Sequence, residues 1–566
     1  MLNNRVEKRA NGKPRILIVG GVAGGASCAT RARRLSEDAE IIIFERGNYV
    51  SFANCGLPYY IGNVITDEAS LLVAKPALFQ DRYGIAVRLQ TEVQAIDRVK
   101  QTITVKNLVT GEICQEYYDA LLLAPGARPV IPPLPGIDLP GIFSLRSIPD
   151  SREIIKWING KKARQAIIIG GGFIGLEMAD NLVKLGLDIT IVEMLTQVMP
   201  ALDAEMAVLL QEHLTANNVS LKMGDGVARF EQNSSGSLTV ITQSGKKYSA
   251  DVIILAIGVR PDIALAIEAG LEIGTAGGIR VDDNMHTSDK NIWAVGDAVE
   301  VKDFVSGEWC LVPMAGPANR QGRLAADAML GRKIKFRGSQ CTMACKVFDI
   351  TIAATGGSEK RLQKLGIPYE KVYLYPNQHA GYYPGAKPIM LKLIFSPLDG
   401  KILGAQAVGE EGVEKRIDVI AMAIQKEATV FDLEEAELCY TPQLGSAKDP
   451  VNMAGMVAAN MLRGDTLLAQ WATSKISNNS FLLDVREVME FREGHITGAV
   501  NIPLHKLRHR LAEIPRDKEI LVYCRSGLRS YIATRILLQN GFKVQNISGG
   551  ILVYDMQKKA EGSNNP

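Results

Sequence analysis

The sequence lacks the features of a secreted or membrane protein. Residues 1–14 are polar, without the apolar core of a secretory signal, and no later stretch holds the roughly 18 apolar residues of a membrane span. A charge bias is also missing: a net charge of +3 among 566 residues gives no general attraction to nucleic acid or to a membrane surface. We therefore expect a soluble, cytoplasmic protein with neither partner, and disorder over residues 1–14.

Cysteines are few and irregularly spaced. The 8 cysteines form no disulfide framework, and even Cys341 and Cys345 have no paired cysteines or histidines nearby to complete a zinc site, so we predict no metal. Six cysteines are expected to be buried and reduced: Cys28, Cys114, Cys310, Cys341, Cys345 and Cys439. The other two, Cys55 and Cys524, stand in motifs of their own.

What the sequence does contain is a repeated strand, glycine turn and helix. In the first copy, an apolar strand over 16–19 leads into a glycine-rich turn over 20–25, and a second strand ends in Glu45. Such glycines let the backbone approach a pyrophosphate at a helix N-terminus, and the later acid is placed to accept hydrogen bonds from a ribose hydroxyl. Val22 replaces the second glycine of the fingerprint, so this copy alone would be a weak prediction.

The second copy matches the fingerprint at every glycine, over residues 166–175, and its second strand ends in Glu193. Glu193 would accept hydrogen bonds from a free 2′-hydroxyl and repel a 2′-phosphate, which favours NADH over NADPH. Residues 122–127 and 255–261 look like crossings between two domains, and Asp297 after an apolar strand could return to a flavin ribitol. The expected dinucleotide contacts are Gly20, Gly21, Ala23, Gly24, Gly25, Glu45, Arg46, Asn54, Pro125, Gly126, Gly170, Gly172, Gly175, Glu177, Glu193, Gly258, Gly296 and Asp297.

Cys55 lies in the run Ser-Phe-Ala-Asn-Cys-Gly-Leu-Pro-Tyr without a second cysteine. One thiol cannot close an internal disulfide, so it must pair with an outside thiol or cycle through an oxidised sulfur acid. With the two nucleotide motifs, this run makes residues 15 to about 460 resemble the coenzyme A disulfide reductases, in the single-cysteine branch of the pyridine nucleotide-disulfide oxidoreductases. The resemblance implies FAD, NADH or NADPH, coenzyme A and a homodimer.

The resemblance also assigns substrate contacts, at Ser27, Arg31, Arg34, Ser51, Asn54, Asn319 and Lys448. Arginines on one helical face can bind the phosphates of coenzyme A, although a solvated helix face is the alternative interpretation of Arg31 and Arg34. Some members of the family carry a histidine where Asn319 stands. In the family, tyrosines at the positions of Tyr382 and Tyr440 lean over the redox cysteine of the partner subunit. Structural interface tyrosines are the alternative, and Tyr383 competes with Tyr382.

A second resemblance covers about residues 480–558. A buried strand over 520–523 opens into the loop Cys524–Ser530, and backbone N–H groups turned toward a cysteine at a helix N-terminus lower the pKa of its thiol. The order Asp-Val-Arg, Gly-His-Ile-Thr-Gly-Ala and Cys-Arg-Ser-Gly-Leu-Arg-Ser resembles a rhodanese domain, with a cysteine phosphatase as the weaker alternative. Arg525, Gly527 and Arg529 would bind substrate, and we interpret His495 as a structural loop residue rather than a base.

We therefore predict an α/β protein with two interleaved Rossmann-like dinucleotide-binding domains, an α+β dimerisation domain and a C-terminal α/β rhodanese domain. The expected boundaries are 15–128 and 261–330 for the FAD-binding domain, 129–260 for the NAD(P)H-binding domain, 331–463 for dimerisation, 464–480 for a polar linker and 481–558 for the rhodanese domain.

The presence of a disulfide reductase and a rhodanese domain in one chain suggests sulfane sulfur as their shared substrate. We expect an NAD(P)H-dependent reductase of coenzyme A disulfide, coenzyme A persulfide or polysulfide, in which Cys55 forms a mixed disulfide with coenzyme A and Cys524 carries sulfane sulfur. The alternatives are an NADH oxidase or peroxidase that cycles Cys55 through a sulfenic acid, a transferase dominated by Cys524, and a redox-sensing or sulfur-relay protein without catalysis.

Overall fold

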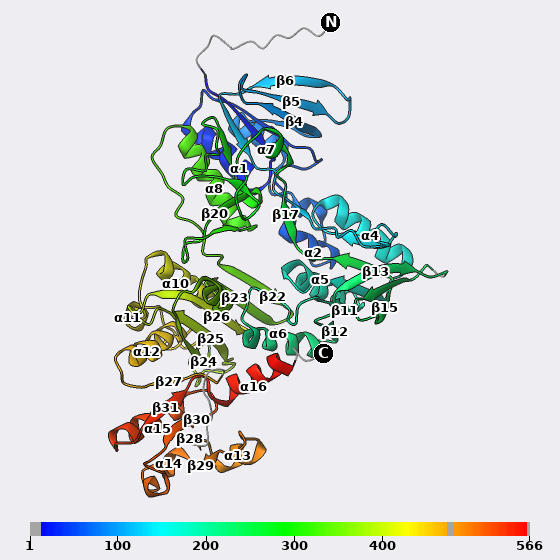
Figure 1. Cartoon of the computed structure of the whole chain (residues 1–566). Helices are drawn as coiled ribbons and strands as arrows, with labels where there is room; N and C mark the ends of the chain where they lie inside the picture. The colour runs from blue at the N-terminus through cyan, green and yellow to red at the C-terminus, as the bar shows by residue number, and fades with distance from the viewer. Residues whose placement is uncertain (1–12, 235, 472–479, 563–566) are drawn as a thin grey trace. The chain divides into compact units, whose positions relative to one another are not determined.

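The computed structural model describes residues 13–234, 236–471 and 480–562 and is coloured along the chain in Figure 1. The chain divides into two compact units: one holds the residues up to Gly170 with Asn181–Ile189 and Ala228–Ser339, and the other holds Gly171–Asp180, Thr190–Val227 and the residues from Gln340 onward. Most of residues 1–14, and residues 472–479 of the expected linker, lie outside the described residues.

The first dinucleotide fold is a five-stranded parallel sheet in the order β19-β7-β1-β2-β3. Its strands are β1 (Arg15–Val19), β2 (Glu40–Phe44), β3 (Ala86–Arg88), β7 (Ala120–Leu123) and β19 (Ile292–Ala294). Ile16, Leu17 and Ile18 of β1 are all buried, as expected for a central parallel strand covered on both faces. Helices α1 (Ala23–Leu35) and α8 (Ala315–Met329) pack against each other.

The second dinucleotide fold is a sheet in the order β12-β11-β10-β16-β9. Its elements are β9 (Ile142–Ser144), α4 (Ile148–Lys161), β10 (Gln165–Ile169), α5 (Phe173–Lys184), β11 (Asp188–Val192), α6 (Ala204–Ala216), β12 (Val219–Lys222) and β16 (Val252–Leu255). Strands β8 (Ala127–Pro129) and β17 (Val259–Pro261) pair antiparallel, so the two chain crossings between the folds lie side by side. The interleaved fold class predicted from the sequence is confirmed.

The dimerisation region contains a five-stranded antiparallel sheet, in the order β22-β23-β26-β25-β24. Its strands are β22 (Met343–Val347), β23 (Ile350–Gly356), β24 (Glu370–Leu374), β25 (Ile389–Phe395) and β26 (Ile402–Gly409). The helices of this region are α9 (Glu359–Leu365), α10 (Val413–Gln425), α11 (Val430–Glu435) and α12 (Pro450–Leu462), of which α10 and α12 pack against the sheet (Figure 1). Strand β24 forms one edge of the sheet.

The C-terminal domain, orange to red in Figure 1, is a parallel sheet in the order β27-β31-β30-β28-β29. Its elements are β27 (Leu468–Ala469), β28 (Ser480–Asp484), α13 (Val488–Glu493), β29 (Val500–Asn501), α14 (Leu504–Leu507), β30 (Glu519–Tyr523), α15 (Leu528–Gln539), β31 (Val544–Ile547) and α16 (Gly550–Gly562). Strand β27 falls inside the expected linker 464–480, because two residues are too few to give a strand pattern in the sequence. The linker prediction therefore needs correction there.

Three α-helices and nine strands of the described residues remain. They are α2 (Leu57–Ile61), α3 (Pro76–Tyr83), β4 (Thr91–Asp97), β5 (Thr102–Asn107), β6 (Ile113–Tyr117), β13 (Val227–Gln232), β14 (Leu238–Thr242), β15 (Lys247–Ala250), α7 (Ala264–Glu268), β18 (Ile279–Arg280), β20 (Val299–Lys302) and β21 (Trp309–Leu311). Among the described residues, no helix combines the length and apolar composition needed to span a bilayer.

The prediction that six cysteines are buried is only partly right. Cys28 and Cys345 are buried, and burial raises the pKa of both thiols, that of Cys345 to about 12. Cys114 and Cys439 are exposed instead, because Cys114 lies on β6, an edge strand, and Cys439 lies in the irregular segment between α11 and α12. All eight cysteines lie among the described residues, and none of them forms a disulfide.

Candidate functional site

Cys55 lies on a short 3₁₀ turn, Asn54–Gly56, immediately before α2. Its side chain is exposed, and its thiol donates a weak hydrogen bond to Asn54 Oδ1 at 3.8 Å. The preceding backbone is fixed by two bonds, from Ser51 N to Gly21 O at 3.0 Å and from Ala53 N to Leu71 O at 2.7 Å. The first glycine turn therefore holds the segment that carries the thiol. The side chain of Ser51, an expected substrate contact, is itself buried.

The first glycine turn has the close packing that a dinucleotide site requires. A Cβ on Gly20 would lie 2.2 Å from Ala124 O, so only glycine fits. The Glu45 carboxylate accepts hydrogen bonds from Gly21 N at 3.0 Å and Gly47 N at 2.8 Å, which fixes its position at the end of β2. These residues fit the FAD that the sequence predicts.

The second glycine turn repeats this arrangement. A Cβ on Gly170 would lie 2.5 Å from Ala256 O, whereas Gly172 has open space around it. Glu193 accepts hydrogen bonds from Gly171 N at 2.7 Å and Leu195 N at 2.8 Å. The residues following Glu193, Met194 and Leu195, are exposed and uncharged, so neither supplies a cation for a 2′-phosphate. The turn fits a nicotinamide dinucleotide.

Other expected cofactor contacts have partners of their own. Asp297 forms an ion pair with Arg146 at 3.0 Å, and Arg46 forms one with Asp262 at 3.2 Å. Gly296 N donates to Gln321 Oε1 at 2.7 Å. Sequence reasoning missed Arg146, because this residue precedes Asp297 by 151 residues and belongs to no motif.

The expected coenzyme A contacts on α1 lie beside α8. Ser27 Oγ donates to Asn319 Oδ1 at 2.5 Å, which brings two of them together. Arg31 forms an ion pair with the buried Asp327 at 2.7 Å, a partner that sequence reasoning missed because it lies 296 residues away. Arg34 is exposed, and no hydrogen bond or ion pair to another described residue accompanies it. Arg34 is thus the more available of the two arginines for a phosphate.

Two of the predicted tyrosines meet in the dimerisation region. The Tyr382 and Tyr440 hydroxyls are 2.7 Å apart, and this hydrogen bond raises the pKa of Tyr382. Their side chains are 75% and 47% exposed, and Lys448 is exposed as well. Tyr383 instead accepts a hydrogen bond from Gln443 at 3.4 Å, so of the two candidates Tyr382 is the one that pairs with Tyr440.

Cys524 is enclosed by its loop. Its side chain is only 1% exposed, and its sulfur accepts hydrogen bonds from Gly527 N at 3.1 Å and Ser530 Oγ at 3.5 Å. Gly527 has φ of 112°, a left-handed conformation that turns its N–H toward the sulfur. The arrangement stabilises a negatively charged sulfur at the start of α15.

The two arginines of this loop differ in their exposure and their partners. Arg525 is exposed, whereas Arg529 is held by Glu490 through two bonds of 2.5 and 2.7 Å. This pairing lowers the pKa of Glu490 to about 2. Sequence reasoning missed Glu490, because its pattern indicates only a helix cap and its partner Arg529 lies 39 residues away. His495 stacks on Phe491 and contacts its carbonyl, which agrees with a structural role.

Comparisons with protein families cover most of the chain. The family model described as pyridine nucleotide-disulphide oxidoreductase matches residues 14–322, and the model of that family's dimerisation domain matches residues 342–449. The rhodanese-like domain model matches residues 468–556, a range that includes β27. Both resemblances inferred from the motifs are confirmed.

Two curated relatives match the part before the rhodanese-like domain. The coenzyme A disulfide reductase of Staphylococcus haemolyticus is 35% identical over 448 residues, which cover 79% of this chain and all of the relative. The NADH oxidase of Methanocaldococcus jannaschii is 34% identical over 449 residues, which cover 79% of this chain and 99% of the relative. Such similar identities do not separate the two activities.

Two solved structures match nearly the whole chain. Reduced Bacillus anthracis CoADR-RHD is 48% identical, with a TM-score of 0.94, and the match covers 96% of this chain and 98% of that one. The NAD-dependent persulfide reductase from A. fulgidus is 38% identical, with a TM-score of 0.88, and the match covers 95% of this chain and 100% of that one. Both matches therefore extend over the oxidoreductase, dimerisation and rhodanese-like regions.

Proposed function

Because the chain belongs to the pyridine nucleotide-disulphide oxidoreductases, we propose that it is an NADH-dependent reductase of coenzyme A disulfide and coenzyme A persulfide, with a sulfur-carrying rhodanese domain. One observation carries the proposal: the chain has two different thiols in two built sites, the exposed Cys55 on its turn and the enclosed Cys524 in its loop. The names of the relative that is a coenzyme A disulfide reductase and of the two matching structures support this choice of substrates.

In the first step, the Cys55 thiolate attacks one sulfur of coenzyme A disulfide. An S–S bond to Cys55 forms, the original S–S bond breaks, and one coenzyme A leaves as a thiolate. With coenzyme A persulfide, attack on the sulfur bonded to carbon gives the same mixed disulfide and releases HS⁻. FAD and NADH, when bound, would supply the two electrons that reduce this mixed disulfide.

The chain's own residues would bind and orient the substrate. Arg34, with Arg31 in its ion pair to Asp327, supplies positive charge for the phosphates of coenzyme A. In a homodimer, Tyr382 and Tyr440 of one subunit would donate a proton or hydrogen bond to the departing thiolate beside Cys55 of the other. Lys448 would contact the same substrate.

Cys524 would hold sulfane sulfur as a persulfide. Its outer sulfur passes to a coenzyme A thiolate, which forms coenzyme A persulfide and returns Cys524 as a thiolate. The N–H of Gly527 and the hydroxyl of Ser530 would stabilise the negative charge, and Arg525 would attract anionic sulfur donors.

The test is anaerobic NADH oxidation with coenzyme A disulfide, coenzyme A persulfide and polysulfide, beside an aerobic assay with oxygen alone. Wild type, Cys55→Ser and Cys524→Ser are compared. We expect Cys55→Ser to lose the reduction of every sulfur substrate, and Cys524→Ser to lose only the use of extended donors such as polysulfide. NADPH should replace NADH poorly, because Glu193 would repel its 2′-phosphate.

A second function is favoured by the NADH oxidase relative and by the exposure of Cys55, since a lone accessible thiol can cycle through a sulfenic acid. Turnover with oxygen at rates far above those with either coenzyme A substrate would support it. That result would refute the proposed reductase and leave the rhodanese domain to be explained separately.

A further inference from the structure

The rhodanese domain contacts an open sheet edge. Among the strands of the described residues, β24 pairs with β25 alone, so its outer backbone groups need other partners. Two of them bond to side chains of the rhodanese region: Lys371 O accepts from Gln470 Nε2 at 3.0 Å, and Tyr373 N donates to Ser548 Oγ at 3.3 Å. Both contacts lie within one compact unit of the chain.

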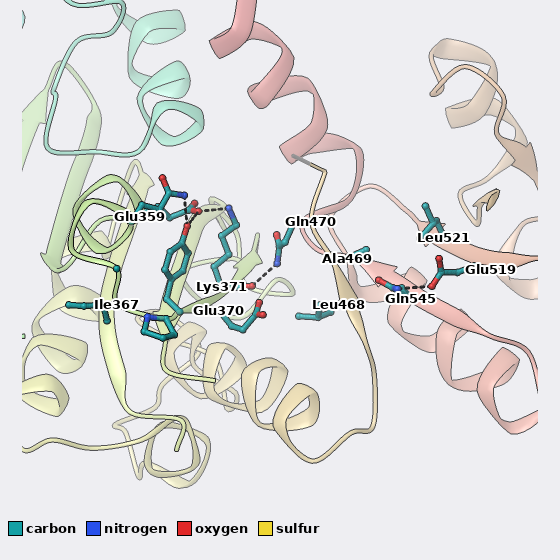
Figure 2. A pocket seen from close by; sticks show the side chains of 14 residues that line it. Glu359, Ile367, Glu370, Lys371, Leu468, Ala469, Gln470, Glu519, Leu521 and Gln545 are labelled. Atoms are coloured by element: carbon teal, nitrogen blue, oxygen red, sulfur yellow. Dashed lines mark hydrogen bonds and ion pairs between the residues drawn. The ribbon is translucent and has the colours of Figure 1, made fainter. Parts of the chain in front are cut away.

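A cavity adjoins the contact between Lys371 and Gln470. The cavity, of about 740 Å³, lies between the start of β24 and the rhodanese sheet, lined on one side by Glu370 and Lys371 and on the other by Glu519 and Gln545. Figure 2 shows Gln470 reaching across to the Lys371 backbone while Glu519 and Gln545 bond to each other. At this end of β24, the Gln470 hydrogen bond therefore lies beside an open space.

Ser548 precedes the turn that contacts the base of the Cys524 loop. It is followed by Gly549 and Gly550, with φ of 73° and 58°. A Cβ on Gly549 would lie 3.0 Å from Tyr373 Cβ, and one on Gly550 would lie 2.4 Å from Cys524 O. This turn thus fills the space between β24 and the loop, with no room for a side chain at either position.

The next backbone groups bind the loop itself. Ile551 N donates to Cys524 O at 2.9 Å, and Leu552 N donates to Arg525 O at 3.2 Å. Burial raises the pKa of Tyr375, two residues beyond Tyr373, and the positive charge of Arg525 opposes that shift. The end of β24 and the loop are therefore close enough to interact electrostatically.

The β24 side of the contact is rigid. The Tyr373 hydroxyl donates to Glu205 at 2.9 Å, and Glu205 also accepts from Lys392, which has no exposed surface. Lys392 binds Asp203 at 2.7 Å and contacts Glu359 as well. Tyr373 is thus attached to a buried network of ion pairs and gives the glycine turn a fixed support.

We propose that the contact of Ser548 with β24, continued through the Gly549–Gly550 turn, positions the Cys524 loop for sulfur transfer, with Ser548 as the positioning residue. The inference rests on the proposed role of Cys524. A loop supported from β24 keeps Gly527 N and Ser530 Oγ at the sulfur, whereas a loop without that support samples geometries in which these donors stabilise the thiolate less well.

The experiment follows alkylation of Cys524 by iodoacetamide in the full-length protein, read from the mass of the peptide that contains it. Ser548→Ala should slow this alkylation roughly 2- to 10-fold, the range expected from one lost hydrogen bond. Ser548→Thr keeps the hydroxyl and should restore the rate. Gln470→Ala is the control, since it removes the other side-chain bond to β24 without touching the glycine turn.

An unchanged or faster rate in Ser548→Ala, or an equal loss in Gln470→Ala at the same melting temperature, would overturn the positioning role. The assay uses no sulfur substrate, so it is independent of the proposed function. If Cys524→Ser retained full use of polysulfide, the proposed function of Cys524 would fail, whatever the alkylation rates.

Discussion

The two candidate redox thiols of this chain sit in opposite environments. Cys55 is exposed on a three-residue turn, while Cys524 is buried in a loop whose donors point at the sulfur. An exposed thiol suits attack on a large disulfide such as coenzyme A disulfide. An enclosed thiol suits storage of a small reactive sulfur, because the loop stabilises the charge and limits access to solvent. The comparison predicts that support beneath the thiol matters more for Cys524.

The largest effect should come from the buried network that supports β24. Lys392→Met would leave Asp203, Glu205 and Glu359 without their shared cation, so we expect the free energy of unfolding to fall by about 3–5 kcal/mol. Urea denaturation measures the loss. The control Lys401→Met removes a largely exposed pair with Glu427, which solvent screens, so its effect should be far smaller. Equal losses in the two variants would show that the buried network stabilises the fold no more than an exposed ion pair does.

Sequence motifs could predict the fold and both thiols, because each glycine turn, strand end and cysteine loop is encoded within about thirty consecutive residues. They could not predict what holds those motifs in place. Asp327 reaches Arg31 across 296 residues, and Lys392 meets Asp203 across 189. Such partners become neighbours only when whole domains pack. Strand β27 also could not be predicted, because its two residues become a strand only by pairing with β31.

A substitution in the Cys524 loop alone tests the role of the Gly527 N–H. Gly527→Ala places a side chain at φ of 112°, where it is strained, and should turn the N–H away from the sulfur. We expect the rate of Cys524 alkylation to fall about tenfold, equivalent to about 1.4 kcal/mol, with Cys55 labelling unchanged. Gly498→Ala is matched, because it has φ of 85° and no neighbour within 4 Å. A similar loss in Gly498→Ala would mean that general strain, not the N–H, is responsible.

The tyrosine pair Tyr382–Tyr440 provides a test of the reaction at Cys55. Tyr440→Phe removes the hydroxyl that bonds to Tyr382, so the pKa of Tyr382 should return toward its ordinary value. If the pair assists the departing thiolate, kcat for coenzyme A disulfide should fall, by about fivefold for one weakened proton donor, while Cys524 alkylation stays constant. Tyr383→Phe, which loses only the bond from Gln443, should have little effect. The reverse order would make Tyr383 the functional residue.

The smallest effect concerns pH and the Arg529–Glu490 pair. Since Arg529 lowers the pKa of Glu490 to about 2, the pair stabilises the fold above the unfolded pKa of about 4.3, and this contribution is lost as the pH falls from there toward 2. Both side chains are partly exposed, so the contribution at pH 7 should stay below about 1 kcal/mol. Glu490→Gln should therefore lower the melting temperature slightly at pH 7, and the difference from wild type should shrink between pH 4.5 and pH 2. A difference that stayed constant across this range would show that the pair acts through packing rather than charge.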